Sequence, residues 1–208
     1  MDCDLRDWPE DCWVGSMKST NTNSTQEAAP HEGVQLQQFG TVDERPIALD
    51  HRVRLMVANT LNVLLADTMS LRDLYKKHHW QVSGPTFYQL HLLFDKHFGE
   101  QAEAVDLLAE RIQTLGGVAV AMAADVAEMT RVVRPPMGRE DTKMQLFRLL
   151  QAHEMLIAEA RKAAHSAAEM GDDGTNDLLV SDIVRMNEFQ VWFITEQMAG
   201  AGLAATTP

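Results

Sequence analysis

The sequence predicts an all-α protein whose core is a four-helix bundle. Four long stretches carry apolar residues at helical spacing, glycine and proline breaks separate them, and no stretch alternates as a strand would. The 208 residues, 45% of them hydrophobic, are enough for one domain with a tail. We expect an acidic, flexible N-terminal tail over 1–45, the helical domain over 46–198 and a short C-terminal tail over 199–208.

The first long helix is expected after Pro46 and to end near Trp80. At about 100° per residue, its apolar residues stay within about 40° of one line along the helix. These residues are Val57, Leu61, Leu64, Leu71 and Tyr75. A break at residues 83–85, which read Ser-Gly-Pro, ends this helix.

Three more long helices and one short helix follow. Their expected ranges are 86–115, 121–129, 140–170 and 176–198. Gly116 and Gly117 stop the second long helix, and Gly171 is placed to cap the third. The short, alanine-rich helix is in the long stretch between the second and third long helices. That stretch is typical of the crossover connection found in some bundles.

Charge and cysteine usage limit the functional classes. The net charge is −12, and residues 1–50 hold ten acids against three bases, which leaves −5 for the remainder. Such a negative net charge does not favour non-specific binding to nucleic acid. The two cysteines, Cys3 and Cys12, are both in the tail, where a metal site with His31 would have sparse spacing that is more often incidental. No secretory signal is visible, and residues 118–124 are too short an apolar run for a membrane helix. We therefore expect a cytoplasmic protein.

Five side chains of metal-ligand type share one side of the first two helices. His79 falls about 40° from the apolar line of the first helix, and with His91 set to zero Asp95 lies at about 40° on the second. Asp106 and Glu110 follow at about 60° and about 100°. Imidazole nitrogen and carboxylate oxygen suit iron, zinc or manganese.

The length of the second helix decides how these residues could meet. Asp95 and Asp106 are about 16 Å apart along the helix axis, which is too far for one metal centre within one chain. A two-fold dimer with antiparallel second helices would bring them together in two identical sites. The alternative is that the histidines are ordinary core residues and the acids a solvated face. No Glu-x-x-His pattern occurs, so the bundle-core di-iron pattern of ordinary ferritins is missing.

The residues around these positions resemble the Dps family, the mini-ferritins named for DNA protection in starved cells. The similar segments are residues 76–87 (KKHHWQVSGPTF), 90–91 (LH), 94–95 (FD) and 106–117 (DLLAERIQTLGG). Counted from His79, the other ligand positions follow after 12, 16, 27 and 31 residues, which matches that family's ferroxidase signature. The resemblance covers about residues 45–200 and is strongest over 76–117.

The resemblance implies a ferritin-like bundle that assembles from two-fold dimers into a hollow dodecamer. It implies that His79, His91 and Asp95 of one subunit bind Fe(II) together with Asp106 and Glu110 of its mate. It further implies oxidation of that Fe(II), preferably by hydrogen peroxide, and storage of a ferric mineral, with zinc as a possible substitute at the site. Protection from oxidative damage is the expected role.

Weaker features complete the expectations. Trp80 could quench stray oxidising equivalents, or simply pack at a dimer contact. Asp172, Asp173 and Asp177 could line an iron-entry pore, or cap a helix start. An alternative function is nucleoid DNA binding with ferroxidase activity secondary. Because the N-terminal tail is acidic and residues 199–208 carry no charged side chain, we expect no tight DNA binding at physiological salt.

Overall fold

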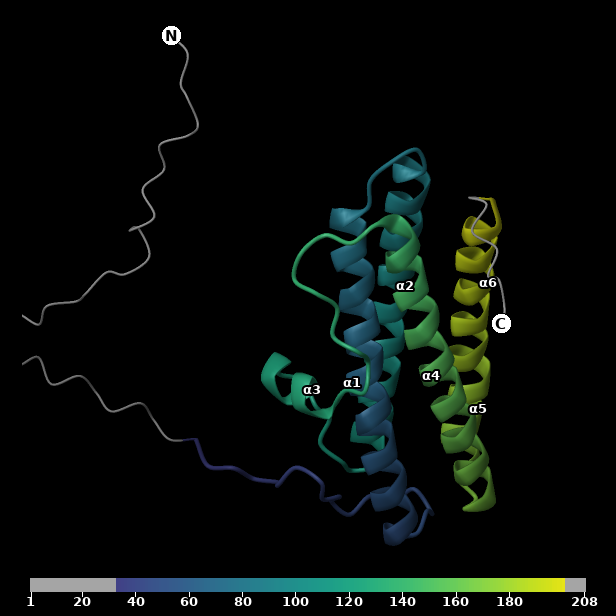
Figure 1. The fold of residues 1–208 in the computed structure, drawn as a ribbon. Coiled ribbons are helices and arrows are strands. Elements are labelled where there is room, and N and C mark those ends of the chain that lie inside the picture. The colour runs from purple at the N-terminus through teal and green to yellow at the C-terminus, as the bar shows by residue number, and fades with distance from the viewer. Residues whose placement is uncertain (1–32, 201–208) are drawn as a thin grey trace, which may run out of the picture. The chain divides into compact units, whose positions relative to one another are not determined.

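The computed structural model describes residues 33–200 of the chain, and every regular element in this part is helical. The elements are α1 (His51–Gln81), α2 (Phe87–Thr114), α3 (Ala123–Met129), α4 (Thr142–Glu169), α5 (Asp173–Leu178), the π-helix η1 (Leu179–Val184) and α6 (Arg185–Gly200). The last three run on without a break and form the fourth long helix (Figure 1). The predicted all-α bundle with a short helix in its crossover is confirmed.

The predicted boundaries of α2, α3 and α4 agree with the structure to within two residues. The first long helix begins only at His51, where Asp50 accepts a hydrogen bond from the amide of Arg52 and caps the helix. The fourth helix begins at Asp173, three residues before the predicted start. Its cap is Asp172, whose carboxylate accepts from the amide of Thr175 at 3.0 Å.

Gly116 and Gly171 end α2 and α4 in the same way. Both have positive φ angles, of 88° and 78°. After α4, the amide of Gly171 bonds to the carbonyl of Ala168, and the next amide bonds to Ala167. This pair of bonds is a Schellman motif, which satisfies carbonyls that the helix leaves without partners. The predicted capping role of Gly171 is therefore confirmed.

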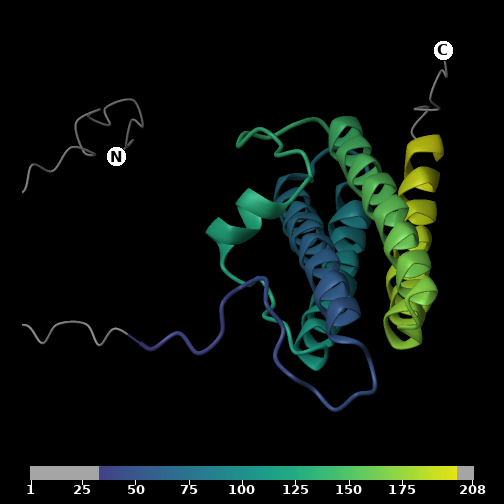
Figure 2. The same cartoon turned by 90° about the horizontal axis from the view of Figure 1, so that it is seen from below.

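The long helices form two neighbouring pairs. Helices α1 and α2 lie side by side, joined by the turn at residues 82–86, and α4 packs against α1 and against the α5–η1–α6 helix (Figure 1). Helix α3 packs on α1 outside this group of four, as the turned view shows (Figure 2). The connection from α2 to α4 is thus the crossover.

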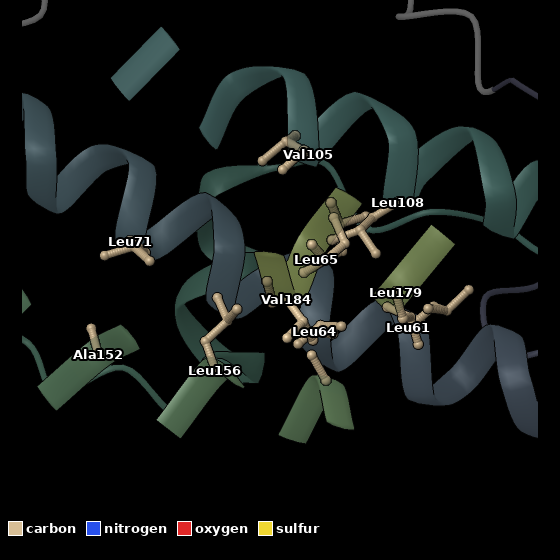
Figure 3. Close-up of a cluster of buried hydrophobic side chains, with 14 of the residues drawn as sticks. Leu61, Leu64, Leu65, Leu71, Val105, Leu108, Ala152, Leu156, Leu179 and Val184 are labelled. Atoms are coloured by element: carbon tan, nitrogen blue, oxygen red, sulfur yellow. The ribbon is translucent and has the colours of Figure 1, made fainter. Parts of the chain in front are cut away.

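The core is a cluster of aliphatic side chains from all four long helices (Figure 3). It includes Leu61, Leu64, Leu65 and Leu71 of α1, Val105 and Leu108 of α2, Ala152 and Leu156 of α4, and Leu179 and Val184 of η1. Truncating one such leucine to alanine costs about 2–5 kcal/mol in a typical core. This packing fixes α1 against α2 and so positions the side chains between them.

Buried polar residues of α1 fasten the crossover to the bundle. Asp67, fully buried, accepts hydrogen bonds from the amide and guanidinium of Arg131 and from the hydroxyl of Thr130. Asn62 bonds to the carbonyl of Val118 and the amide of Val120. None of the helices within residues 33–200 is long and apolar enough to cross a membrane.

Part of the segment assigned to the tail is hydrogen-bonded to the bundle. The amide of Asp43 and the side chain of Gln37 both donate to the carbonyl of Gly116, at 2.8 Å each. Arg54, which is 1% exposed, donates to the carbonyls of Asp43 and Leu115. The part of the chain that packs with the bundle therefore starts before α1.

Candidate metal centre

His79 of α1 and His91 of α2 form a stacked pair across the interface of the two helices. Their ring centroids are 3.8 Å apart and their planes differ by 18°. The Nδ1 atom of His79 lies 2.8 Å from the carbonyl oxygen of His91, and Nδ1 of His91 lies 2.9 Å from the carbonyl oxygen of His79. Each ring is thus held by the backbone of the other helix.

These reciprocal hydrogen bonds fix Nδ1 as a protonated nitrogen in both rings. A carbonyl oxygen only accepts, so each Nδ1 must carry the proton and donate. In a neutral imidazole the lone pair is then on Nε2, which is the arrangement that a metal-ligating histidine needs. The carbonyls act here as the outer partners that orient metal-binding histidines in many sites. The pair therefore presents two nitrogen donors without any rearrangement of the rings.

Asp95 lies beside this pair on α2, one turn after His91. Its Oδ1 atom is 3.9 Å from Nε2 of His79 and 2.5 Å from Nζ of Lys76. The hydrogen bond from Lys76 is the main cause that holds the pKa of Asp95 below its ordinary value, and the nearby imidazoles add to it. Asp95 is therefore a carboxylate at neutral pH, with half of its side chain open to solvent.

Lys76 is a site residue that the sequence analysis missed. It lies one turn before His79, and residues three apart on a helix share a face. Its ammonium also lies 4.6 Å from the ring centroid of Phe98, which restricts where the long side chain can go. The i, i+3 spacing from His79 was the signal that could have identified it.

Asp106 and Glu110 lie further along α2, both exposed. Within residues 33–200, no group of three or more His, Cys, Asp or Glu side chains surrounds a single metal position. One chain therefore brings His79, His91 and Asp95 close together but does not unite all five predicted ligands. This arrangement is the one expected if Asp106 and Glu110 serve a second chain.

The other predicted site residues have varied surroundings. Trp80 is 70% exposed on α1, next to His79. Asp172 is 2% exposed, and its carboxylate is held by Arg111 at 2.5 Å and by the hydroxyl of Thr175. Asp173 and Asp177 are exposed at the start of the fourth helix. Cys3, Cys12 and His31 lie outside the described residues.

Comparisons with known proteins agree with this fold. The family described as "Ferritin-like domain" matches residues 58–201, which places the chain among ferritin-like proteins. A solved structure of DpsC from Streptomyces coelicolor is 53% identical with a TM-score of 0.79, and the match covers 84% of this chain and 98% of that one.

Two more distant relatives extend the comparison. The "Nutrient stress-induced DNA-binding protein" of a Nostoc species is 35% identical over 74% of this chain and 83% of its own length. A structure from Vibrio cholerae O1 is 26% identical with a TM-score of 0.70, covering 78% of this chain and 99% of its own. That Vibrio protein is described as a Dps protein and a member of "a broad superfamily of ferritin-like diiron-carboxylate proteins". The chain belongs to the Dps family of ferritin-like proteins.

Proposed function

We propose that this protein binds Fe(II) at sites shared between two-fold-related subunits, oxidises it, and stores the ferric product. The observation that carries the proposal is the His79–His91 pair, whose reciprocal backbone hydrogen bonds leave both Nε2 lone pairs available. Two imidazoles and the anionic Asp95 form a nitrogen and oxygen donor set suited to Fe(II). The Dps relatives support iron as the metal.

The second half of each site comes from another subunit in this proposal. Asp95 and Asp106 are separated by eleven residues of one continuous helix, about 16 Å along its axis. An antiparallel α2 of a partner subunit would carry its Asp106 and Glu110 to the His79 end of the first. Two-fold symmetry then produces two identical sites per dimer.

The reaction consumes two Fe(II) for each hydrogen peroxide. Each Fe(II) loses one electron, the O–O bond of the peroxide breaks, and two protons complete two molecules of water. Each Fe(III) then hydrolyses to hydrated oxide, taking its oxygen from water and releasing three protons. The imidazoles and carboxylates hold Fe(II) and, by leaving coordination positions open, admit the oxidant. Lys76 keeps Asp95 ionised until the metal competes for the same oxygen.

The assembled state and the setting follow the family in this proposal. We infer a hollow dodecamer built from two-fold dimers, whose interior receives the ferric mineral. In the cytoplasm such a protein would lower the concentration of free Fe(II), and with it the yield of hydroxyl radical from peroxide. Asp173 and Asp177, exposed at a helix start, are the acids that we propose attract Fe(II), since Asp172 is engaged by Arg111.

The first test is Fe(II) oxidation by the full-length protein under anaerobic conditions, with peroxide added at half the iron concentration. We expect Asp106→Ala to slow oxidation at least about 100-fold, because one carboxylate ligand is lost from every site. Glu103→Gln is the matched control, since Glu103 is an exposed acid of the same helix outside the ligand set. Equal slow rates in wild type and Asp106→Ala would refute the ferroxidase function.

Mixing variants tests whether the sites are shared. Neither His91→Ala nor Asp106→Ala alone has an intact site, but a dimer of one with the other has one intact site. Random co-assembly should therefore restore about a quarter of the sites. Co-assembly of Asp106→Ala with Glu110→Ala is the control, because both changes affect the same half of the site and no site is restored. Absence of recovery in the first mixture would refute the shared arrangement.

A further inference from the structure

A series of hydrogen bonds connects α1, α4 and α6 in the interior of the bundle. Oη of Tyr75 on α1 lies 2.5 Å from Nε2 of His153 on α4, and Nδ1 of His153 lies 2.9 Å from Oδ1 of Asn187 on α6. All three side chains are fully buried. A phenol, an imidazole and an amide are thus connected in line away from solvent.

A backbone carbonyl determines which atoms donate and which accept in this series of hydrogen bonds. Nδ2 of Asn187 donates to the carbonyl of Ile183 at 2.7 Å, so Oδ1 is the atom that faces His153. An amide oxygen accepts, and Nδ1 of His153 therefore carries the proton. The lone pair of His153 is then on Nε2, and the phenol of Tyr75 donates its proton to it.

Burial keeps both groups neutral until a reaction occurs. Desolvation lowers the pKa of His153 to about 3, so its ring is uncharged near neutral pH and Nε2 is free to accept. Desolvation raises the pKa of Tyr75 well above its ordinary value, so the phenol keeps its proton. A phenol that loses an electron becomes a far stronger acid, and a base at hydrogen-bond distance can then take the proton.

Tyr75 is also close to the place where oxidants would form. It lies one turn before His79 on the same helix, about 6 Å along the axis. The ring of Phe94 is 6.1 Å from that of Tyr75, and His97 meets it edge-on at 5.2 Å. Nδ1 of His97 lies 3.2 Å from the phenolic oxygen and is a second group that could hold it once its proton has moved.

We propose that Tyr75 is a one-electron donor that intercepts oxidising radicals formed beside the metal centre, with His153 as the acceptor of its proton. The O–H bond of Tyr75 breaks, the proton binds Nε2 of His153, and the electron passes to the oxidant. A hydroxyl radical, formed when one Fe(II) reduces peroxide, gains that electron and a proton from solvent and becomes water. The phenoxyl oxygen later regains its proton from His153 and an electron from another Fe(II), which becomes Fe(III).

Enclosure distinguishes Tyr75 from Trp80, the residue that the sequence suggested for this role. Trp80 is 70% exposed, whereas the phenol of Tyr75 is fully buried among core side chains next to its proton acceptor. A radical on Tyr75 is therefore shielded from further reaction. The inference rests on the proposed function for the source of the oxidant, but the electron donation itself can be tested without iron.

The chain has only two tyrosines, which makes the test direct. Metal-free, full-length protein is oxidised with azide radical, a small one-electron oxidant generated by radiolysis, and the product is trapped for electron paramagnetic resonance. We expect a tyrosyl signal in Tyr88→Phe, which removes the exposed phenol that azide radical also oxidises. Adding Tyr75→Phe to that variant should reduce the signal at least about tenfold. A missing signal in Tyr88→Phe, or one that survives the added Tyr75→Phe, overturns the proposal.

The role of His153 is tested by His153→Gln, which keeps a hydrogen-bonding side chain but no base. The tyrosyl signal should form at least about tenfold more slowly, and its g-values should shift because the imidazolium no longer donates to the radical oxygen. Unchanged formation rate and g-values overturn the proton-acceptor role. Circular dichroism checks that both variants fold. The Asp106→Ala iron assay does not involve Tyr75, so failure of the ferroxidase function and failure of this inference are separate results.

Discussion

At the scale of single residues, hydrogen-bond acceptors decide which ring nitrogen carries a proton in three of the histidines. The carbonyls of His79 and His91 force each other's ring to protonate at Nδ1, and Asn187 does the same for His153. The surroundings then separate their roles. His79 and His91 are partly exposed at the helix interface, whereas His153 is enclosed. In our proposals the same type of side chain therefore serves as a metal ligand in one place and as a neutral proton acceptor in the other.

The enclosure of His153 predicts a loss of stability in acid. Its pKa is about 3 in the folded protein and near 6.5 in the unfolded chain, so the unfolded chain binds the extra proton. The contribution is complete above pH 6.5 and is lost as the pH falls toward 3, by about 1.4 kcal/mol per pH unit. Urea unfolding at pH 7 and pH 5, at one protein concentration, measures it.

His153→Gln is the matched variant for this measurement because glutamine does not titrate. The pH dependence of its unfolding free energy should be smaller than that of the wild type by about one proton. Comparing the two proteins removes the contribution of carboxylates, which titrate in both. If both lose the same stability between pH 7 and pH 5, His153 is not the group responsible.

At the scale of helices, local signals were enough for most boundaries. Glycine caps and the Ser-Gly-Pro break are read directly from the chain, and α2 to α4 were predicted to within two residues. The start of the fourth helix was not, because Asp172 caps it while being held by Arg111 from another helix. The π-helical turn of η1 was not predicted either, since it has no sequence pattern of its own.

The two glycine caps give a prediction with an internal comparison. Gly171→Ala should destabilise the protein by about 1 kcal/mol, because alanine is strained at a φ of 78° although the space around it is open. Gly116→Ala should cost about 3 kcal/mol, since its Cβ would also lie 2.5 Å from the carbonyl oxygen of Asp43. Urea unfolding at fixed protein concentration measures both. Equal losses would show that the Asp43 segment moves aside freely.

At the same scale, residue spacing along a helix predicts some features of the candidate site and not others. The angular positions of His79, His91 and Asp95 follow from 100° per residue, and the structure does bring these three together. The stacking of the two rings depends on how closely α1 and α2 approach. The hydrogen bond from Lys76 to Asp95 also depends on that approach. Spacing within one helix carries no information on either contact.

At the scale of the whole molecule, the net charge indicates which partners the protein attracts and which it repels. The chain carries −12, of which residues 1–50 contribute −7, so an assembly of many copies would be strongly negative. Such a surface attracts Fe(II) and repels a polyanion of the same sign. The Nostoc relative is nevertheless named a DNA-binding protein. Whether this chain shares that property is therefore a question about its own charge distribution.

We expect this protein not to bind DNA tightly near physiological salt. With few clustered Lys and Arg side chains, little counterion release is available, and the dissociation constant for duplex DNA should be weaker than about 10⁻⁵ M at about 0.15 M salt. A gel-shift titration with full-length protein and EDTA present measures it. Millimolar Mg²⁺ should permit weak association, because a divalent cation can bridge phosphate and carboxylate. A tight shift in EDTA that weakens steeply between about 0.05 and 0.2 M salt would instead reveal a basic surface that the net charge conceals, and DNA protection would then stand beside iron oxidation as a function.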